Sequence, residues 1–223
     1  MNKHINVTYK VYANNYSIKK ALDKLSNSKI LSYDCETQSV YSIEEKAEAK
    51  ELLKCCTDEL STKDRRLSKL VAKSSGLSNP RLVKITHFLF GLSETESVIL
   101  ISNNYKTEVM ICDWICNFEG KLLVHNSVFD ISLVYSRVHR FPKDLEDTQL
   151  LAKTLVNHTQ NWHSRVGLKH LMGSHFDPRW TALVETYDIV DYKNPNFLMY
   201  CAIDAAATFK LWNQLQEHLD ETL

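Results

Sequence analysis

An apolar stretch near the start of the chain, residues 30–37, ends in two acidic side chains that are separated by one position, Asp34 and Glu36. If this stretch is a β-strand, both carboxylates project from the same face, because side chains alternate along a strand. Like charges placed side by side repel each other, so the arrangement needs a reason. Hard divalent cations such as Mg²⁺ and Mn²⁺ favour carboxylate oxygens. The spacing therefore favours a metal site.

Two further carboxylates stand at positions that could complete such a site. Asp130 follows a short apolar segment that runs into a helical pattern, a junction from which a side chain can project into a cleft. Asp204 lies on a long helical stretch, four residues after Tyr200, so the phenol and the carboxylate share one helix face. The alternative is that the four acids form separate salt bridges or helix caps. Their order and placement favour a single site.

The elements that must position these residues are read from the apolar periodicity. Strands are predicted at 5–12, 30–37, 82–90, 97–101 and 121–124, and helices at 17–25, 106–118, 127–138, 166–172 and 197–219. Ser17 is the expected N-cap of the first helix, and Gly173 is expected to end the helix before it. Asp147 either supports the cleft or caps a helix. The pattern predicts an α/β fold with a mixed sheet.

The segment between the second and third predicted strands has a different character. Residues 42–60 and 62–73 are two highly charged helical patterns, and we interpret them as an inserted helical hairpin. The first helix is mainly acidic and the second mainly basic. The basic residues that could follow a phosphate backbone are Lys63, Arg65, Arg66 and Lys69. The alternative is a solvated face that pairs with its acidic neighbour.

Composition limits the class of protein. The 223 residues carry 27 basic and 27 acidic side chains, so contacts with nucleic acid must come from local patches and bound metal. No apolar run of about eighteen residues and no signal peptide is found, which predicts a cytoplasmic protein without membrane contacts. Lysine and asparagine usage, together with the family resemblance described below, suggests a bacterial or phage-infected cell. The six cysteines include no Cys-x-x-Cys pair and are expected to be free thiols.

Three segments together resemble the motifs of a known family. Asp34-Cys35-Glu36, residues 126–130 and Tyr200-x-x-x-Asp204 are similar to the motifs of the DEDD 3′-to-5′ exonucleases, in the subgroup with a tyrosine four residues before the last aspartate. More closely, residues 145–148, 167–171 and 200–211 resemble the proofreading exonuclease domain of family A DNA polymerases. Only the insertion at about 42–80 departs from that domain. The resemblance implies a ribonuclease H-like fold and one exonuclease domain over residues 1–223.

The resemblance also implies a reaction and the residues that perform it. The expected activity is 3′-to-5′ hydrolysis of single-stranded or frayed DNA to nucleoside 5′-monophosphates, with two divalent ions, Mg²⁺ or Mn²⁺. Asp34 is expected to bridge both ions, while Tyr200 orients the attacking water. Glu36 and Asp204 are expected to complete the first metal site, and Asp130 to hold the second ion. The expected substrate contacts are Asn126, Phe129 and the backbone of Thr37.

Two alternatives remain open at the level of the sequence. An exoribonuclease similar to RNase D shares the same four acids, and the residues that would distinguish ribose from deoxyribose cannot be located. A non-catalytic nucleic-acid-binding or replisome scaffold subunit would keep the fold. The expected partner is nucleic acid, above all a single-stranded DNA 3′ end, with a polymerase or a single-strand-binding protein as further candidates.

Overall fold

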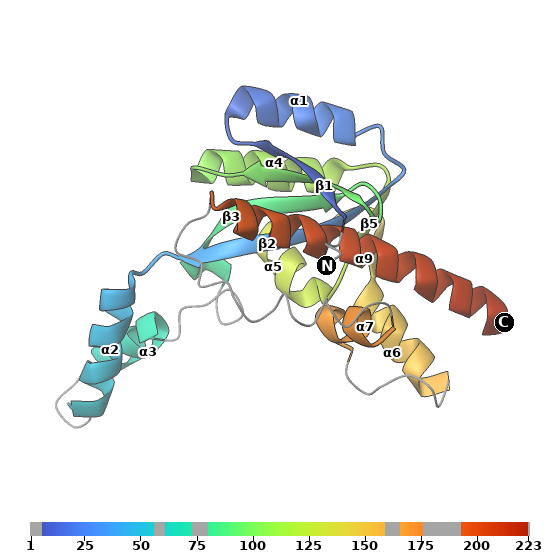
Figure 1. Ribbon diagram of the computed structural model, residues 1–223. Helices are drawn as coiled ribbons and strands as arrows, with labels where there is room; N and C mark the ends of the chain where they lie inside the picture. Colours follow the sequence, from blue (N-terminus) through green and yellow to red (C-terminus); the bar gives the residue numbers. More distant parts are fainter. Residues whose placement is uncertain (1–5, 56–60, 73–79, 159–165, 176–192, 223) are drawn as a thin grey trace. The chain divides into compact units, whose positions relative to one another are not determined.

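The computed structural model describes residues 6–55, 61–72, 80–158, 166–175 and 193–222 (Figure 1). Within them, six strands form one sheet in the order β1-β4-β3-β2-β5-β6. The strands are β1 (Thr8–Tyr12), β2 (Ile30–Ser39), β3 (Val83–Gly91), β4 (Glu96–Ile101), β5 (Lys121–Val124) and β6 (Leu145–Asp147). β1 is parallel to β4, and β5 is parallel to both β2 and β6, whereas β3 is antiparallel to β4. The predicted mixed sheet is confirmed.

Helices cover both faces of this sheet. They are α1 (Asn15–Leu25), α4 (Tyr105–Asn117), α5 (Ser127–Val138), α6 (Thr148–His158), α7 (Leu168–His175) and α9 (Pro195–Thr222). Leu89 of β3 is in the same apolar core as α9, while the next residue, Phe90, packs edge-on against Trp114 of α4. Since neighbouring residues of a strand point to opposite faces, α4 and α9 lie on opposite sides of the sheet, as Figure 1 shows. The α/β fold class is therefore confirmed.

The central strand β2 carries the first two acidic residues as the sequence predicts. Leu31, Tyr33 and Cys35 are buried, whereas Asp34 and Glu36 are partly exposed. This alternation places the two carboxylates on one face of the strand. Because Leu31, Tyr33 and Cys35 are buried in the core, a shift of β2 by one residue would expose them, so the direction of Asp34 and Glu36 is fixed.

Helix α9 lies unusually close to the sheet. The hydroxyl of Ser32 donates to the carbonyl of Ala205 at 2.6 Å, and the hydroxyl of Ser97 donates to the carbonyl of Ala202 at 2.8 Å. A Cβ atom added to Gly91 would lie 2.8 Å from the Ala205 carbonyl oxygen, so only glycine fits this contact. The two serines hold the helix turn that carries Asp204 at a fixed height above β2.

Two predicted helix boundaries are wrong. α1 begins at Asn15 with Asn14 as its N-cap, and Ser17 instead completes the capping box as the third helical residue. Gly173 does not end its helix, because α7 continues to His175. Residues 176–192, for which the sequence gives no clear pattern, lie outside the described residues.

The chain divides into two compact units, Met1–Glu36 with Thr86–Leu223, and Thr37–Ile85. The second unit contains α2 (Ile43–Cys55) and α3 (Thr62–Ala72), which pack against each other as the predicted hairpin requires. That the whole chain acts as one exonuclease domain stays a prediction. No helix in the described part of the chain is long and apolar enough to span a membrane.

Candidate active site

Three of the four predicted carboxylates meet above the centre of the sheet. Asp34 and Glu36 of β2 and Asp204 of α9 each offer an oxygen atom, and these atoms lie within 4.8 Å of one another. The strand supplies two ligands through its alternation, and the helix supplies the third through its close approach to β2. Such a group of oxygen ligands suits a hard divalent cation.

The fourth carboxylate reaches β2 from another element. Asp130 stands in the first turn of α5 with only 3% of its side chain exposed. Its Oδ1 atom accepts a hydrogen bond from the thiol of Cys35 at 3.1 Å, and burial, then the charge of Asp34, raise its pKa. Asp130 thus reaches β2 at Cys35, the residue next to Asp34 in the sequence. That Asp34 bridges two ions stays a prediction.

Burial and mutual repulsion oppose full ionisation of these four carboxyl groups. Burial, and next the charge of Asp204, raise the pKa of Asp34 to about 7. Burial, and next the charges of Asp34 and Asp204, raise the pKa of Glu36 to about 8. Burial likewise raises the pKa values of Asp130 and Asp204. Groups that resist ionisation together at neutral pH, and that offer only oxygen, fit the divalent ions that the sequence predicts.

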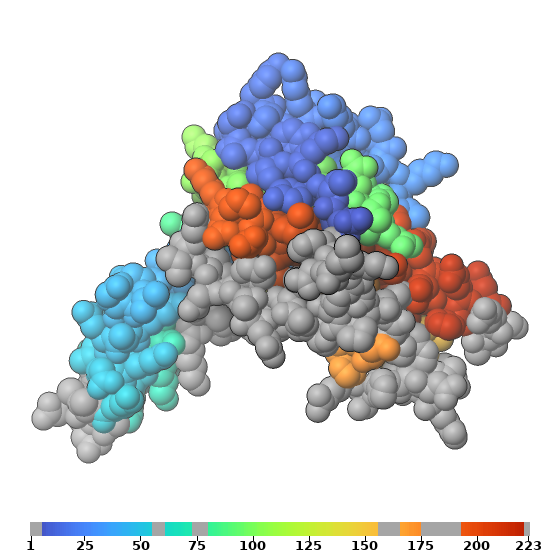
Figure 2. Space-filling view, viewed as in Figure 1, coloured from blue at the N-terminus to red at the C-terminus, as the bar shows by residue number. Residues whose placement is uncertain are grey.

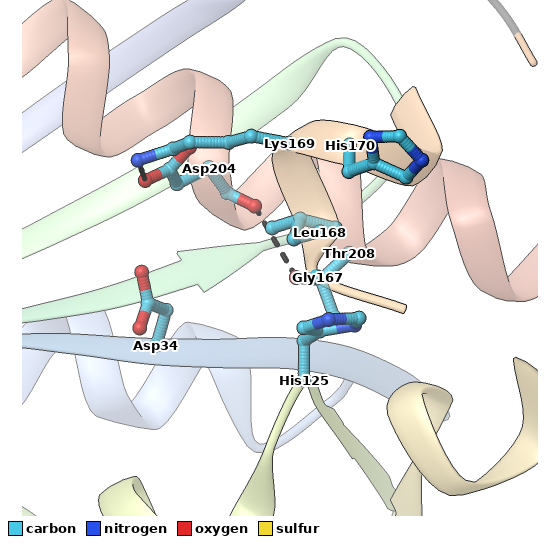
Figure 3. Close-up of a pocket in the computed structure, with 8 residues that line it drawn as sticks. All are labelled: Asp34, His125, Gly167, Leu168, Lys169, His170, Asp204 and Thr208. Atoms are coloured by element: carbon cyan, nitrogen blue, oxygen red, sulfur yellow. Dashed lines mark hydrogen bonds and ion pairs between the residues drawn. The ribbon is translucent and has the colours of Figure 1, made fainter. Parts of the chain in front are cut away.

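Lys169, at the start of α7, is a site residue that the sequence analysis did not single out. Its Nζ atom lies 3.0 Å from Oδ2 of Asp204 and lowers the pKa values of Asp34, Glu36 and Asp204 (Figure 3). It also donates to the hydroxyl of Tyr200 and lies 4.1 Å from the centre of that ring. The only sequence signal was its place in the segment 167–171, which resembles the polymerase exonucleases. Its proximity to Asp204 is visible only in three dimensions.

Tyr200 lies where the spacing of four predicts, on the same face of α9 as Asp204. Its ring stacks on Phe197 at a centroid distance of 6.4 Å, and Lys169 links its hydroxyl to the Asp204 carboxylate. The tyrosine is thus held beside the metal-ligand cluster by contacts on both its ring and its hydroxyl.

A cavity of about 330 Å³ opens beside these groups. Figure 3 shows the residues that line it: Asp34, His125, Gly167, Leu168, Lys169, His170, Asp204 and Thr208. The cavity thus has carboxylates and an ammonium group at one end and the start of α7 along its wall. Its size suits part of a nucleotide.

His125 belongs to the frame of this cavity. Its Nε2 atom lies 2.9 Å from the carbonyl oxygen of Val166, and its Nδ1 atom lies 2.9 Å from the hydroxyl of Thr148. Because a carbonyl group only accepts hydrogen bonds, Nε2 must carry the proton. Burial lowers the pKa of His125 to about 4, so the ring is neutral. It ties the end of β5 to α6 and to the segment before α7, and it is not a catalytic base.

Asp147 shapes the entrance to α5. Although burial raises its pKa, hydrogen bonds from Ser127, Gln149 and Asn126 lower it overall. Its carboxylate accepts from the backbone amides of Asn126 at 3.1 Å, Ser127 at 2.8 Å and Gln149 at 2.8 Å. Asp147 therefore caps both α5 and α6, which decides between the two roles that the sequence left open. Asn126 adopts a left-handed backbone at φ 70°, and its side chain makes no capping bond.

The other predicted substrate contacts are divided between α5 and the unit Thr37–Ile85. Phe129 is partly buried in the first turn of α5, next to Asp130. Thr37 and the four cations of α3, which are Lys63, Arg65, Arg66 and Lys69, belong to the unit Thr37–Ile85. Their contacts with a substrate stay a prediction.

No protein-family model and no curated protein sequence matches this chain. Solved structures match its fold. Brucella melitensis NrnC with bound Mg²⁺ is 11% identical with a TM-score of 0.57, over 97% of this chain and 83% of that one. The catalytic core of RRP6 from Trypanosoma brucei is 12% identical with a TM-score of 0.60, over 96% and 47%. Escherichia coli RNase D, an exoribonuclease involved in structured RNA processing, is 10% identical with a TM-score of 0.57, over 96% and 46%.

At these identities the likeness establishes the fold. The chain has the ribonuclease H-like α/β fold of DEDD-type exonucleases, as the sequence motifs predict. A closer kinship with the proofreading domain of family A polymerases stays a prediction.

Proposed function

We propose that this chain is a metal-dependent 3′-to-5′ exonuclease that releases nucleoside 5′-monophosphates from single-stranded or frayed nucleic acid. One observation supports the proposal: oxygen atoms of Asp34, Glu36 and Asp204 lie within 4.8 Å of one another, and Asp130 of α5 reaches the same strand at Cys35. These residues lie in a fold shared with DEDD-type exonucleases. Separate structural roles for the four acids would not require them to meet.

The carboxylates divide into two groups that share Asp34. Asp34, Glu36 and Asp204 would hold one divalent ion, and Asp34 with Asp130 would hold a second. Mg²⁺ or Mn²⁺ bound there would lower the pKa of water and stabilise charge on the attacking and leaving oxygens. The Mg²⁺ bound in the structure of Brucella melitensis NrnC supports this choice of ion.

Tyr200 and Lys169 act as a pair beside the carboxylates. A phenol, with an ordinary pKa of about 10, is a poor base at neutral pH, so the proposed role of Tyr200 is to orient the attacking water. Lys169 donates to the Tyr200 hydroxyl and contacts Asp204, which fixes the position of the phenol relative to the metal ligands. Its positive charge also lies close to where negative charge develops on the phosphate.

The start of α5 is the proposed seat of the terminal nucleotide. The left-handed backbone of Asn126 turns the chain from β5 into α5 one turn before Asp130. Because the Asn126 side chain makes no capping bond, its amide group can bind the nucleotide. Phe129 offers an aromatic face for a base.

The substrate could contain deoxyribose, as in DNA, or ribose, as in RNA. The sequence resemblance favours DNA, with a polymerase or single-strand-binding protein as partner. RNA is supported by the likeness to RNase D, which is described as an exoribonuclease, and to NrnC, which was solved bound to pGG. We therefore propose both as substrates to be compared directly, since the carboxylate chemistry is the same for each.

The experiment uses one strand sequence as DNA and as RNA, labelled at the 5′ end, with Mg²⁺ or Mn²⁺. We expect a ladder that shortens one nucleotide at a time and releases nucleoside 5′-monophosphates. The Asp34→Asn variant should be inactive, whereas Asp23→Asn, at an exposed position of α1, should match the wild type. The proposal fails if neither strand is shortened in a metal-dependent way. Cleavage of a circular strand, which has no 3′ end, would show that the protein is an endonuclease instead.

A further inference from the structure

The hairpin of α2 and α3 buries small side chains and exposes large ones. Where the two helices pack, Ala49 of α2 is 5% exposed and Ser68 of α3 is 9% exposed. The large apolar side chains lie outside that contact: Ile43, Leu52, Leu67 and Leu70 are exposed by 82%, 45%, 54% and 40%. Leu67 and Leu70, three positions apart, share one face of α3, and neighbouring exposed apolar groups of this kind are typical of an interaction surface.

The outer face of α3 is basic and apolar. Lys63, Arg66, Leu67 and Leu70 follow the spacing of one helix face and are all exposed. Within the described residues, none of the α3 cations forms a salt bridge, including Arg65 and Lys69. The interpretation that this helix pairs with its acidic neighbour finds no support in these contacts.

The outer face of α2 has the opposite charge. Glu44, Glu48 and Leu52 follow one another at intervals of four and form an exposed stripe, with Glu45 beside it. Among the described residues of this helix, the salt bridge between Lys54 and Glu51 at 3.0 Å involves neither Glu44 nor Glu48. Figure 2 shows the surface of the hairpin, with α2 in light blue and α3 in blue-green.

We infer that the hairpin is a docking surface for a second copy of this chain. A two-fold axis would bring the acidic stripe of α2 against the basic face of α3 in the partner, and the same contact would form twice. Glu44 and Glu48 would then face Lys63 and Arg66 of the partner subunit, while Leu52 would pack near Leu67 and Leu70. The hairpin carries both halves of this interface, so no other protein is needed to explain it. The inference does not depend on the proposed nuclease activity.

Nucleic acid fits the same surface less well. A strand that follows phosphates would meet the glutamates of α2 as well as the cations of α3, and it would not cover the exposed leucines. Binding of single strands commonly uses aromatic side chains as stacking platforms, and α2 and α3 have none in their described sequences. A partner with acidic and apolar groups on a helix matches the surface better.

The first test measures the mass of the full chain by sedimentation over a range of concentrations. We expect a particle of twice 25.8 kDa that dissociates as protein is diluted or salt is raised, because the charged contacts are exposed. The variant with Lys63→Glu and Arg66→Glu should be a monomer. A control with Lys19→Glu and Lys106→Glu, exposed positions on α1 and α4, carries the same change in charge and should remain a dimer.

The second test uses complementary variants. The variant with Glu44→Lys and Glu48→Lys should also be a monomer by itself, because both of its hairpin helices are then basic. When it is mixed with the Lys63→Glu, Arg66→Glu variant, each α2 meets an oppositely charged α3, and a heterodimer should form. Recovery of the dimer on mixing would show that the variants are folded.

Three results would overturn the inference: a wild type that is a monomer at every concentration, reversed variants that dimerise like the wild type, or complementary variants that do not associate. If Lys63→Glu with Arg66→Glu weakens binding of a single-stranded oligonucleotide and leaves the mass unchanged, the surface binds nucleic acid instead.

Discussion

The thiol of Cys35 donates to Oδ1 of Asp130 at a distance of 3.1 Å. Cys35 stands between Asp34 and Glu36 in the sequence, but its side chain points to the other face of β2 and is buried. Cys35, which lies between the proposed ligands Asp34 and Glu36 in the sequence, thus hydrogen-bonds to a third proposed ligand, Asp130, on the opposite face of β2. Burial, and next the charges of Asp130 and Asp34, raise the pKa of the Cys35 thiol, so it remains a donor and is not a soft metal ligand.

Replacing Cys35 by alanine should loosen Asp130. The substitution removes a hydrogen bond to a buried carboxylate, and we expect the free energy of unfolding to fall by about 1–3 kcal/mol. Cys35→Ser keeps a donor of similar size and should retain Mn²⁺ affinity better than Cys35→Ala. Urea unfolding and calorimetric Mn²⁺ titration measure both effects. Equal Mn²⁺ affinity in the two variants would show that the thiol does not position Asp130.

The positive charge of Lys169 partly neutralises the carboxylates that would bind a metal ion, so Lys169 and the ion compete for them. Its loss in Lys169→Met should raise Mn²⁺ affinity by roughly threefold to tenfold, the effect of one partly exposed charge contact worth about 1 kcal/mol. Cleavage should nevertheless slow, because Tyr200 loses its hydrogen-bond donor. Lys169→Arg, which keeps the charge, should bind Mn²⁺ like the wild type. Weaker Mn²⁺ binding by Lys169→Met would contradict this assignment.

Gly91 controls the distance between α9 and the sheet. In Gly91→Ala the new Cβ would lie 2.3 Å from Ser32 Oγ and 2.8 Å from the Ala205 carbonyl oxygen, so the helix must shift. We expect a loss of about 1–3 kcal/mol in the free energy of unfolding, together with weaker metal binding as Asp204 moves away from β2. Gly167→Ala is the matched control, since its Cβ would meet nothing within 4 Å. Similar stability of the two variants would mean that the approach of α9 is not tight.

The stability of the metal-free protein should depend on pH in an unusual direction. The ordinary pKa values of Asp34 and Glu36 are 3.8 and 4.5, and the folded protein raises them to about 7 and about 8. Between these limits the folded state binds more protons than the unfolded state, so the free energy of unfolding falls as pH rises. Thermal melts in a chelator should therefore give a higher Tm near pH 5 than near pH 8.

The variant with Asp34→Asn and Glu36→Gln isolates this effect from other titrating groups. Both replacements are neutral, so the fall in Tm between these pH values should be smaller than in the wild type. Saturating Mg²⁺ should also reduce the fall, because the ion favours the ionised carboxylates. An identical pH dependence in the wild type and this variant would rule out the carboxylates as its source.

The sequence predicted those parts of the site that follow from local periodicity. The alternation of β2 placed Asp34 and Glu36 on one face, and the spacing of Tyr200 and Asp204 placed both on one face of a helix. Each of these relationships spans a few residues of one element, where backbone geometry decides the direction of the side chains. Five of the six strands and most of the flanking helices followed from the same periodicity, whereas β6 and α6 were not predicted.

What the sequence did not predict depends on contacts between distant segments. Lys169 reaches Asp204 only because α7 and α9 pack together, and Cys35 reaches Asp130 only because β2 lies beside the start of α5. Nothing in the local pattern around either residue records its partner. Gly173 shows the opposite error, since a local stop signal was overridden and the helix continued.

The central claim is that a metal site organised by Asp34 performs 3′-end hydrolysis. The most direct test measures two quantities in the same samples. Mn²⁺ binding is followed by the loss of the electron paramagnetic resonance signal of free Mn²⁺, and 3′-end shortening is followed on a labelled strand. For the wild type, we expect two bound Mn²⁺ ions per chain and a cleavage rate that rises with their occupancy. We expect Asp34→Asn to lose both properties while remaining folded. A wild type that shortens the strand in excess chelator, or an Asp34→Asn variant that cleaves at the wild-type rate, would contradict it.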